Sequence, residues 1–587
     1  MRRFLMRFFA TIGILVVVLV LATAGLFVWA RTHGPSIGDN TILSLDIGSG
    51  FPDAPPTSAL SQVLFPGRPP LRDVLDAIER AGDDPRVKGL IARVGDGEMG
   101  LAEAQELRDA IIAFRAKGKR AVAYADSIGE FAPGTRSYYV AAAFDTIWLQ
   151  PMGLVGLVGL RAEEPFFRGT LDKLGILPRF DRREEYKSAA DPLMEKAMTA
   201  PDRAQIQALL DSVYGQIVSG IAADRKLDPA TVRTLVDKGP LLAHEALAAH
   251  LIDHIGYSDD ALKSLGVGPG GKRRPLPLMR YLAAVGRPHK SGPTIALIYA
   301  SGLIARGRSE DSPLASSSAL GADDVIHAFR MAERDPAVRA ILFRIDSPGG
   351  SAVASESIWR ETVRAKAAGK KVIVSMGDVA GSGGYYIAAA ADKIVAEPAT
   401  LTGSIGVVAG KVVLTGLADK IGAAVSAVQV GADAGLSSAF EDFTPAGYQR
   451  FETFLDDVYA GFKERVAQGR KLDAATVESI AKGRIWSGED AKAHGLVDAL
   501  GGYATALALA KQEAGIPATS DVTVKLFPPP ESVASRVIAR LTGRRPDAGR
   551  DDAVMARAVS MLAPLVAQFE QLTAHPGALV MAPVELH

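Results

Sequence analysis

The chain has 587 residues, a length that corresponds to three or four domains of about 150 residues each. Lys and Arg together number 66, and so do Asp and Glu, so the net charge gives no support to a nucleic-acid partner. Cysteine is absent, which excludes disulfide bonds, thiolate metal sites and a cysteine nucleophile.

The first feature along the chain is a long uncharged segment. Three arginines precede residues 8–30, a stretch of 23 residues that carries no charge. Because a bilayer requires about 20 apolar residues, this stretch predicts a transmembrane helix. Only Arg31 follows it directly, so the arginine distribution predicts a cytoplasmic N-terminus and places the rest of the chain across the membrane. A signal peptide cleaved near Ala22-Thr23-Ala24 is the alternative, although the apolar region of a signal peptide has only about 7–15 residues.

Beyond residue 40 the sequence repeats itself. Residues 226–232 (KLDPATV) return as residues 471–477 (KLDAATV), 245 positions later. Together with the anchor predicted at 1–31, the duplication predicts a first domain at 40–265, a linker at 266–293, a second domain at 294–514 and a tail at 515–587. The tail contains two helix-like segments, near 533–541 and 553–572.

Predicted strands and helices alternate within both copies. Short apolar runs predict buried strands at 42–45, 295–298, 341–345 and 372–374. Residues with the i, i+3, i+4, i+7 spacing of a helix that buries one face are Leu71, Val74, Leu75 and Ile78. A similar stripe in the second copy begins at Val325. This alternation predicts an α/β fold with a mostly parallel sheet.

The two copies differ where a serine nucleophile would lie. The second copy reads Gly381-Ser382-Gly383-Gly384 after a predicted strand, whereas the first copy has no glycine-flanked serine there. A serine at a strand-to-helix turn exposes its hydroxyl, and the amide of Gly383 would point to the developing oxyanion. The pair Gly349-Gly350 follows another strand and could supply a second amide. Because Ala380 replaces the first glycine of a G-x-S-x-G elbow, the local pattern also fits two ordinary glycine turns.

A serine nucleophile also requires a base. Histidine is scarce, and His244, His250 and His494 fall in segments common to both copies, as expected of structural residues. The carboxylates are scattered without the spacing of a metal site. A lysine is the remaining candidate, and it accepts a proton only as the neutral amine. Burial therefore has to disfavour its ammonium form by about 4–5 kcal/mol.

Four motifs carry a resemblance to a known family. They are Asp346-Ser347-Pro348-Gly349-Gly350-Ser351, Gly377-Asp378-Val379-Ala380-Gly381-Ser382-Gly383-Gly384-Tyr385-Tyr386, Leu401-Thr402-Gly403-Ser404-Ile405-Gly406 and Tyr186-Lys187-Ser188. With these motifs, from about residue 42 to residue 514, the chain resembles the long membrane-anchored form of the signal peptide peptidase A family (protease IV). It departs from the pattern at Gly381, where relatives have alanine.

The resemblance implies a fold and a chemistry. The fold is α/β, with two tandem domains related to Clp-type proteases and crotonases after one N-terminal transmembrane helix. The chemistry is that of a serine endopeptidase with a Ser/Lys dyad, in which Ser382 is the nucleophile and Lys187 the general base, without metal or cofactor. The other implied site residues are Gly383 and either Gly349 or Gly350 as the oxyanion hole, and Ser404 as the residue that orients Lys187.

The resemblance also implies a cellular setting and partners. Members of the family degrade the signal-peptide remnants that signal peptidase releases into the membrane. A single-pass protein of the bacterial inner membrane is implied, held in the bilayer by residues 8–30 with its catalytic part in the periplasm. A bowl-like homotetramer with internal sites would admit only small, extended peptides.

The distribution of lysine between the copies supports Lys187. Under the repeat shift Lys187 corresponds to residues 432–434, and no lysine occurs from 421 to 462. The copy that has Ser382 therefore lacks the lysine, and the copy that has Lys187 lacks the serine, as expected of one composite site. Taken alone, Lys187 also fits a surface lysine among charged neighbours. The sequence leaves open whether the two residues meet within one protomer or between two.

Two other functions remain as alternatives. A crotonase-type acyl-CoA hydrolase would use the glycine loops for a thioester oxyanion and leave Ser382 incidental. A non-catalytic membrane scaffold would have two inactive copies. The predicted topology disfavours the hydrolase, because a domain beyond the membrane would rarely meet acyl-CoA.

Overall fold

A computed structural model describes most of the chain between residues 37 and 529. The description omits residues 49, 56–67, 96, 98, 131–132, 268–273 and 310–318, and beyond 529 it includes only the backbone of Leu579–Met581. The transmembrane helix predicted at 8–30 and the tail helices predicted near 533–541 and 553–572 lie outside these residues. Within the described part, no helix has both the length and the apolar character needed to cross a membrane.

The described residues of the first copy form a six-stranded sheet in which all neighbouring strands are parallel. Its order is β8-β4-β3-β2-β1-β9. The strands are β1 (Thr41–Asp46), β2 (Val87–Arg93), β3 (Arg120–Ala125), β4 (Thr146–Leu149), β8 (His254–Ile255) and β9 (Leu276–Pro277). The strand predicted at 42–45 is therefore confirmed as β1.

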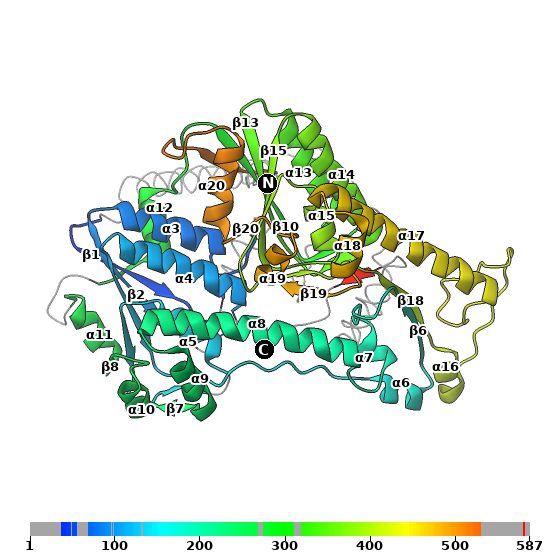
Figure 1. The fold of residues 1–587 in the computed structure, drawn as a ribbon, viewed down its shortest axis with the longest axis horizontal. Helices are drawn as coiled ribbons and strands as arrows, with labels where there is room; N and C mark the ends of the chain where they lie inside the picture. Colours follow the sequence, from blue (N-terminus) through cyan, green and yellow to red (C-terminus); the bar gives the residue numbers. More distant parts are fainter. Residues whose placement is uncertain are drawn as a thin grey trace, which may run out of the picture.

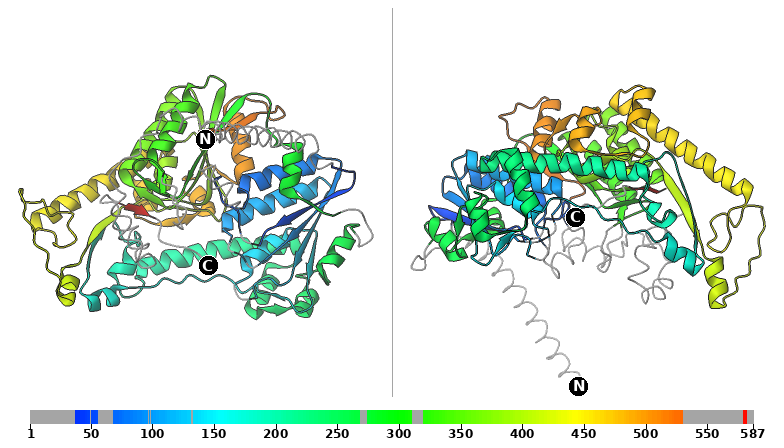
Figure 2. Two further views of the ribbon diagram at one scale, coloured as in Figure 1. Left: turned by 180° about the vertical axis from the view of Figure 1, so that it is seen from behind. Right: turned by 60° about the horizontal axis from the view of Figure 1, so that its bottom comes forward.

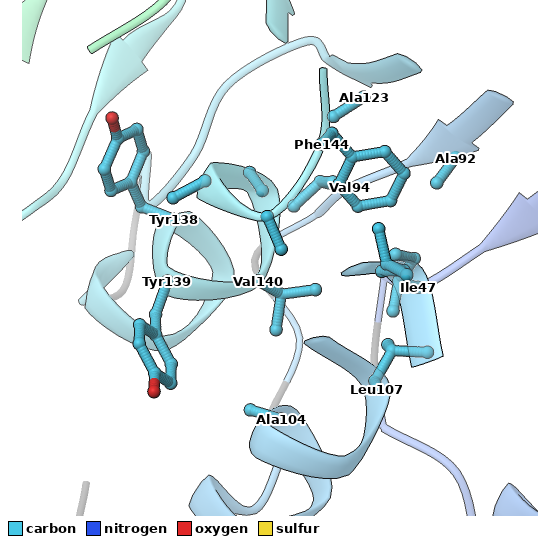
Figure 3. Close-up of a cluster of buried hydrophobic side chains, with 14 of the residues drawn as sticks. Ile47, Ala92, Val94, Ala104, Leu107, Ala123, Tyr138, Tyr139, Val140 and Phe144 are labelled. Atoms are coloured by element: carbon cyan, nitrogen blue, oxygen red, sulfur yellow. The ribbon is translucent and has the colours of Figure 1, made fainter. Parts of the chain in front are cut away.

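Among the helices that contribute to the core of the first copy are α3 (Leu71–Asp83), α4 (Leu101–Ala116) and α5 (Thr135–Ala142). The predicted stripe on α3 is confirmed, since Leu71, Val74 and Ile78 are buried. Figure 3 shows Val140 of α5 close to Leu107 of α4 within this buried cluster. Burial of these apolar faces holds the helices in place.

The second copy repeats this architecture. The strand β10 (Thr294–Ser301) lies between β13 (Val338–Ser347) and β21 (Thr523–Leu526), and β15 (Lys371–Gly381) follows β13 in the sheet. The sheet continues through β16 (Lys393–Ala396) to β20 (Ala499–Leu500). The predicted strands at 295–298, 341–345 and 372–374 are confirmed. The accompanying helices are α13 (Ala322–Arg334), α14 (Ala352–Ala367) and α15 (Gly383–Ala388).

Individual contacts also repeat between the copies. The hydroxyl of Tyr138 donates to the carbonyl of Leu251 at 2.7 Å, and the hydroxyl of Tyr385 donates to the carbonyl of Leu496 at 2.9 Å. Both tyrosine side chains are fully buried, so this residue of each Tyr-Tyr pair has a packing role. The long helices α8 (Ala200–Arg225) and α17 (Pro445–Arg470) each have 26 residues.

Two predicted boundaries need correction. Residues 276–285, which were expected to lie in a linker, form β9 and α12 (Leu278–Val285), and Tyr281 of α12 is buried in the first core. The second copy continues past residue 514, because β21 pairs with β10 as β9 pairs with β1. Each copy thus ends with a strand beside its own first strand, a long-range pairing that local sequence does not reveal.

A third sheet joins the copies. The strand β6 (Leu177–Arg182) of the first copy pairs antiparallel with β18 (Val408–Val413) of the second. The same sheet contains β11 (Leu303–Ala305), β12 (Ala319–Gly321), β14 (Gly349–Ser351) and β22 (Leu579–Met581). Figures 1 and 2 show α8 running between this sheet and the first copy. The loop that follows β6 is thereby carried to the second copy.

The remaining described elements are short. In the first copy they are β5 (Leu154–Val155), α6 (Arg168–Leu174), α7 (Asp191–Met194), α9 (Pro229–Lys238), β7 (Leu241–Leu242), α10 (Ala243–Ala248) and α11 (Ser258–Ser264). In the second copy they are β17 (Leu401–Gly403), α16 (Thr415–Ile421), α18 (Ala474–Ile480), β19 (Ile485–Ser487), α19 (Gly488–Ala493) and α20 (Tyr503–Glu513). The strand β17 pairs with both β15 and β19.

Buried charged groups hold the two copies together. Arg344 of β13 donates to Asp53 at 2.7 Å and to Glu106 of α4 at 2.5 Å. Asp378 of β15 accepts hydrogen bonds from the amides of Ala102 (2.8 Å) and Glu103 (3.1 Å), at the start of α4. An acidic group at a helix N-terminus is favourable, so a residue of the second copy stabilises a helix of the first. These carboxylates are scattered in the sequence, but the fold brings them together.

Candidate active site

Ser382 occupies a strained turn between β15 and α15. Its φ is 58° and its ψ is −117°, a backbone conformation that residues with a side chain rarely adopt. The amide of Ser382 donates to the carbonyl of Gly403 at 2.8 Å, and its carbonyl accepts from the amide of Tyr386 at 2.8 Å. These two contacts hold the backbone of the turn, and both are made within the second copy.

Lys187 reaches this serine from the first copy. Its Nζ lies 2.6 Å from Oγ of Ser382, 2.8 Å from Oγ of Ser404 and 3.0 Å from the carbonyl oxygen of Ser404. The side chain of Lys187 is 0% exposed, and burial lowers its pKa well below the ordinary value of lysine. Burial thus favours the neutral amine, which is the form that can accept a proton. The contact lies within one chain, the arrangement that the sequence left undecided.

Ser404 lies at the end of β17, on the other side of the lysine. Its φ of 51° is also in the left-handed region, and its amide donates to the carbonyl of Arg484 at 2.7 Å. With Ser382 and Ser404 as neighbours, the Nζ of Lys187 has hydroxyl groups on two sides. Such contacts restrict the amine to one orientation.

The glycines of the two predicted loops lie side by side. A Cβ atom on Gly383 would come within 3.1 Å of the amide nitrogen of Gly350 and 3.2 Å of Cα of Gly349. The amide of Gly349 donates to Oγ of Ser347 at 3.2 Å, so Gly350 is the better candidate for the second oxyanion donor. Gly383 is the first residue of α15, where an amide has no acceptor within the helix.

A short segment of the second copy completes the site, and the sequence did not predict it. The amide of Tyr186 donates to the carbonyl of Lys482 at 3.2 Å, and the amide of Gly483 donates to the carbonyl of Ile405 at 2.8 Å. A Cβ atom on Gly483 would lie 2.6 Å from Cβ of Lys187, so glycine is needed for this approach. Residues 482–485 thus lie between the lysine loop and the Ser404 turn. Only the glycine was a possible signal in the sequence.

The described residues contain no group of three or more histidine, aspartate and glutamate side chains arranged to hold a metal ion. The predicted oxyanion glycines, Ser382, Ser404 and Lys187 are all brought together. The arrangement presents a hydroxyl in contact with a buried amine, beside two glycine loops whose backbone amides are candidate oxyanion donors. These are the groups required for acyl transfer through a serine ester.

Comparison with known proteins gives an independent result. The model of peptidase family S49 matches residues 113–268 and 364–517, one stretch mainly in each copy. "Serine protease SPPA, chloroplastic" of Arabidopsis thaliana is 35% identical over 454 residues, which cover 76% of this chain and 66% of that protein. "Protease 4" of Haemophilus influenzae is 32% identical over 456 residues, covering 75% of this chain and 72% of that protein. "Protease 4" of Salmonella typhi is 31% identical over 525 residues, covering 84% and 82%.

Proposed function

The chain belongs to peptidase family S49, and from this premise we propose that it is a serine endopeptidase that degrades cleaved signal peptides and other small apolar peptides. The relatives that cover most of the chain are named as proteases, and one carries the name SPPA. We assign the chemistry to a dyad of Ser382 and Lys187. The observation that carries this assignment is the distance of 2.6 Å between Nζ of a fully buried lysine and Oγ of a serine in a strained turn.

The proposed reaction has two acyl-transfer steps. The neutral amine of Lys187 takes the proton of Ser382 as Oγ attacks the peptide carbonyl. The amides of Gly383 and Gly350 stabilise the resulting oxyanion, and Ser404 keeps the lysine oriented. Lys187 then gives its proton to the leaving amine, and the ester on Ser382 remains. A water molecule, deprotonated by Lys187, hydrolyses this ester and restores both residues.

The third sheet supports a mode of peptide binding. The segment Leu579–Met581 pairs antiparallel with β14, where Gly350 is opposite Val580, and with β18, where Val408 is opposite Leu579. An extended segment of three residues therefore fits between these strands, beside the oxyanion glycines. We propose that substrates bind there as an added strand, since main-chain pairing is tolerant of sequence.

We further propose the setting in which the peptidase acts. The uncharged stretch at 8–30 and the arginines before it support a single-pass anchor in the bacterial inner membrane. The two copies would then lie in the periplasm, where cleaved signal peptides are accessible from the bilayer. A homotetramer remains part of this proposal.

The function is tested with the full-length protein in detergent. We expect hydrolysis of a synthetic signal peptide and of apolar peptide esters, and reaction of Ser382 with a serine-directed fluorophosphonate. Ser382→Ala should abolish both, whereas Ser357→Ala, at a half-buried position on α14, should change neither. Faster turnover of acyl-CoA than of any peptide would favour a crotonase-type hydrolase. Absence of both hydrolysis and labelling in the wild-type protein would favour a scaffold.

A further inference from the structure

The loop that carries Lys187 reaches from the first copy to the second. It follows β6 and precedes α7, and it belongs to the first copy, whereas its target Ser382 belongs to the second. A lysine side chain has considerable rotamer freedom, so both the loop and the amine need external support. Nη1 of Arg182 lies 3.4 Å from the carbonyl oxygen of Lys187, and further supporting groups are found on α8 and in residues 482–485.

Gln205 of α8 is the side chain that joins these parts. Its Nε2 lies 3.0 Å from the carbonyl oxygen of Tyr186, directly before Lys187, and 3.1 Å from Oγ of Ser188, directly after it. A third acceptor, Oδ1 of Asp202, lies at 3.0 Å. On the other side, Oε1 of Gln205 accepts a hydrogen bond from the amide of Ile485 at 3.3 Å. The side chain is 1% exposed, so these contacts are shielded from water.

The chemistry of the partners explains why this residue is an amide. The carbonyl of Tyr186 can only accept a hydrogen bond, and the amide of Ile485 can only donate one. This difference fixes which end of the Gln205 side chain is oxygen and which is nitrogen. Lysine or arginine would offer no acceptor to Ile485, and glutamate would offer no donor to Tyr186.

The contact with Ile485 continues to the nucleophile. Ile485 is the first residue of β19 and is opposite Gly403 of β17. The carbonyl of Gly403 in turn accepts the hydrogen bond from the amide of Ser382 at 2.8 Å. Gln205 therefore connects the residues on both sides of the lysine with the strand pair that holds the serine turn.

From this geometry we propose that Gln205 is a positioning residue for the general base. It fixes the Lys187 loop against the second copy, so that Nζ stays in its buried place between Ser382 and Ser404. This inference rests on the proposed dyad. Loss of the contact would let the loop move away from residues 482–485 and admit water to the amine.

A matched control exists on the same helix. Gln216 lies 11 residues further along α8, about 16 Å along the helix axis. Its Nε2 donates to the carbonyl of Pro398 at 3.1 Å and to Glu489 at 2.9 Å, so it also joins the two copies. Among its contacts described here, none involves the Lys187 loop. Gln216→Leu thus loosens the junction between the copies without acting on the base.

The test compares Gln205→Leu with Gln216→Leu in the full-length protein. Rates are measured with a peptide ester and divided by the concentration of active sites, which fluorophosphonate labelling counts. For Gln205→Leu we expect kcat to fall by about 10- to 100-fold with KM nearly unchanged, as for a misplaced catalytic group. We also expect the acid limb of kcat to move to higher pH, because a hydrated lysine has a higher pKa. Gln216→Leu should keep the wild-type kcat and acid limb.

A second variant covers the possibility that leucine prevents folding. Gln205→Asn keeps an amide in the buried site but is one methylene too short to reach Tyr186 and Ile485 together. We therefore expect a smaller fall in kcat and a smaller shift of the acid limb. The proposal is overturned if folded Gln205→Asn or Gln205→Leu has the kcat and acid limb of the control. The proposed function is tested by the wild-type protein alone. It would be contradicted if the wild type neither hydrolyses the ester nor reacts with the fluorophosphonate.

Discussion

At the scale of single residues, the proposed dyad makes the pH dependence of the reaction depend on the protonation state of Lys187. Burial lowers the pKa of this lysine, so the neutral base is present at lower pH than for an exposed lysine. The base becomes inactive as the pH falls through the lowered pKa, because the ammonium form cannot take the proton of Ser382. The chemistry thus depends on a desolvated position rather than on a second charged residue.

The first prediction concerns this pH profile. We expect kcat/KM for a peptide ester to reach its maximum near neutral pH and to decrease at lower pH along a single acid limb. The exposed Lys173→Ala in α6 should leave the limb in place. Activity that appears only above about pH 10, where an ordinary lysine loses its proton, would contradict a buried base.

The second prediction concerns Gly350, which has no room for a side chain. Its φ is 145°, and a Cβ atom would lie 2.1 Å from the carbonyl oxygen of Ile304. Gly350→Ala should therefore displace the proposed oxyanion donor and reduce kcat by about 100-fold. Gly369→Ala is the control, since Gly369 has a φ of 82° but open space around it, and it should cost only about 1 kcal/mol of stability. Equal kcat values for the two variants would remove Gly350 from the site.

At the scale of elements, the site depends on strands that meet edge to edge. The β6–β18 pair brings the lysine loop to the second copy, and β17 joins the serine turn to β19. The segment Leu579–Met581 lies on the edge where we propose that peptides bind. A bound segment of the same chain competes with substrate at a high effective concentration.

The third prediction follows from this competition. Val580→Pro removes an amide from the centre of the segment and is incompatible with paired strands on both sides. We expect KM for a peptide ester to fall several-fold with kcat unchanged, whereas Val580→Ala should resemble the wild type. Steady-state kinetics decide the matter, and an unchanged KM for Val580→Pro would mean that the segment does not share the substrate edge.

At the scale of the whole molecule, duplication followed by divergence accounts for the composite site. Both copies retain the same parallel sheet, the same 26-residue helix and the same buried tyrosine contact. Only the second copy has the serine turn, and only the first supplies the buried lysine. The proposed dyad therefore requires that the two copies remain docked, and the Arg344 cluster and the Asp378 contact both join them.

The sequence predicted those features that local patterns encode. Apolar periodicity identified β1, β10, β13, β15 and α3, and the glycine-flanked serine identified the turn at Ser382. Comparison of the copies singled out Lys187, because a residue missing from one copy leaves a visible gap. Local patterns did not predict the roles of Gln205 and residues 482–485. They also did not predict the hydrogen bonds from the start of α4 to Asp378. Gln205 contacts Ile485 over 280 positions and Asp378 contacts Glu103 over 275 positions, and such contacts leave no periodic signal.

We propose above all that a lysine from the first copy activates a serine of the second. The most direct measurement is the rate at which a fluorophosphonate labels Ser382 in the wild type, in Lys187→Ala and in the surface control Lys173→Ala, each checked for folding. We expect Lys187→Ala to lower the labelling rate by at least about 1,000-fold at neutral pH, while Lys173→Ala keeps the wild-type rate. If folded Lys187→Ala labels as fast as the wild type, the base for Ser382 lies within the second copy and the composite site is wrong.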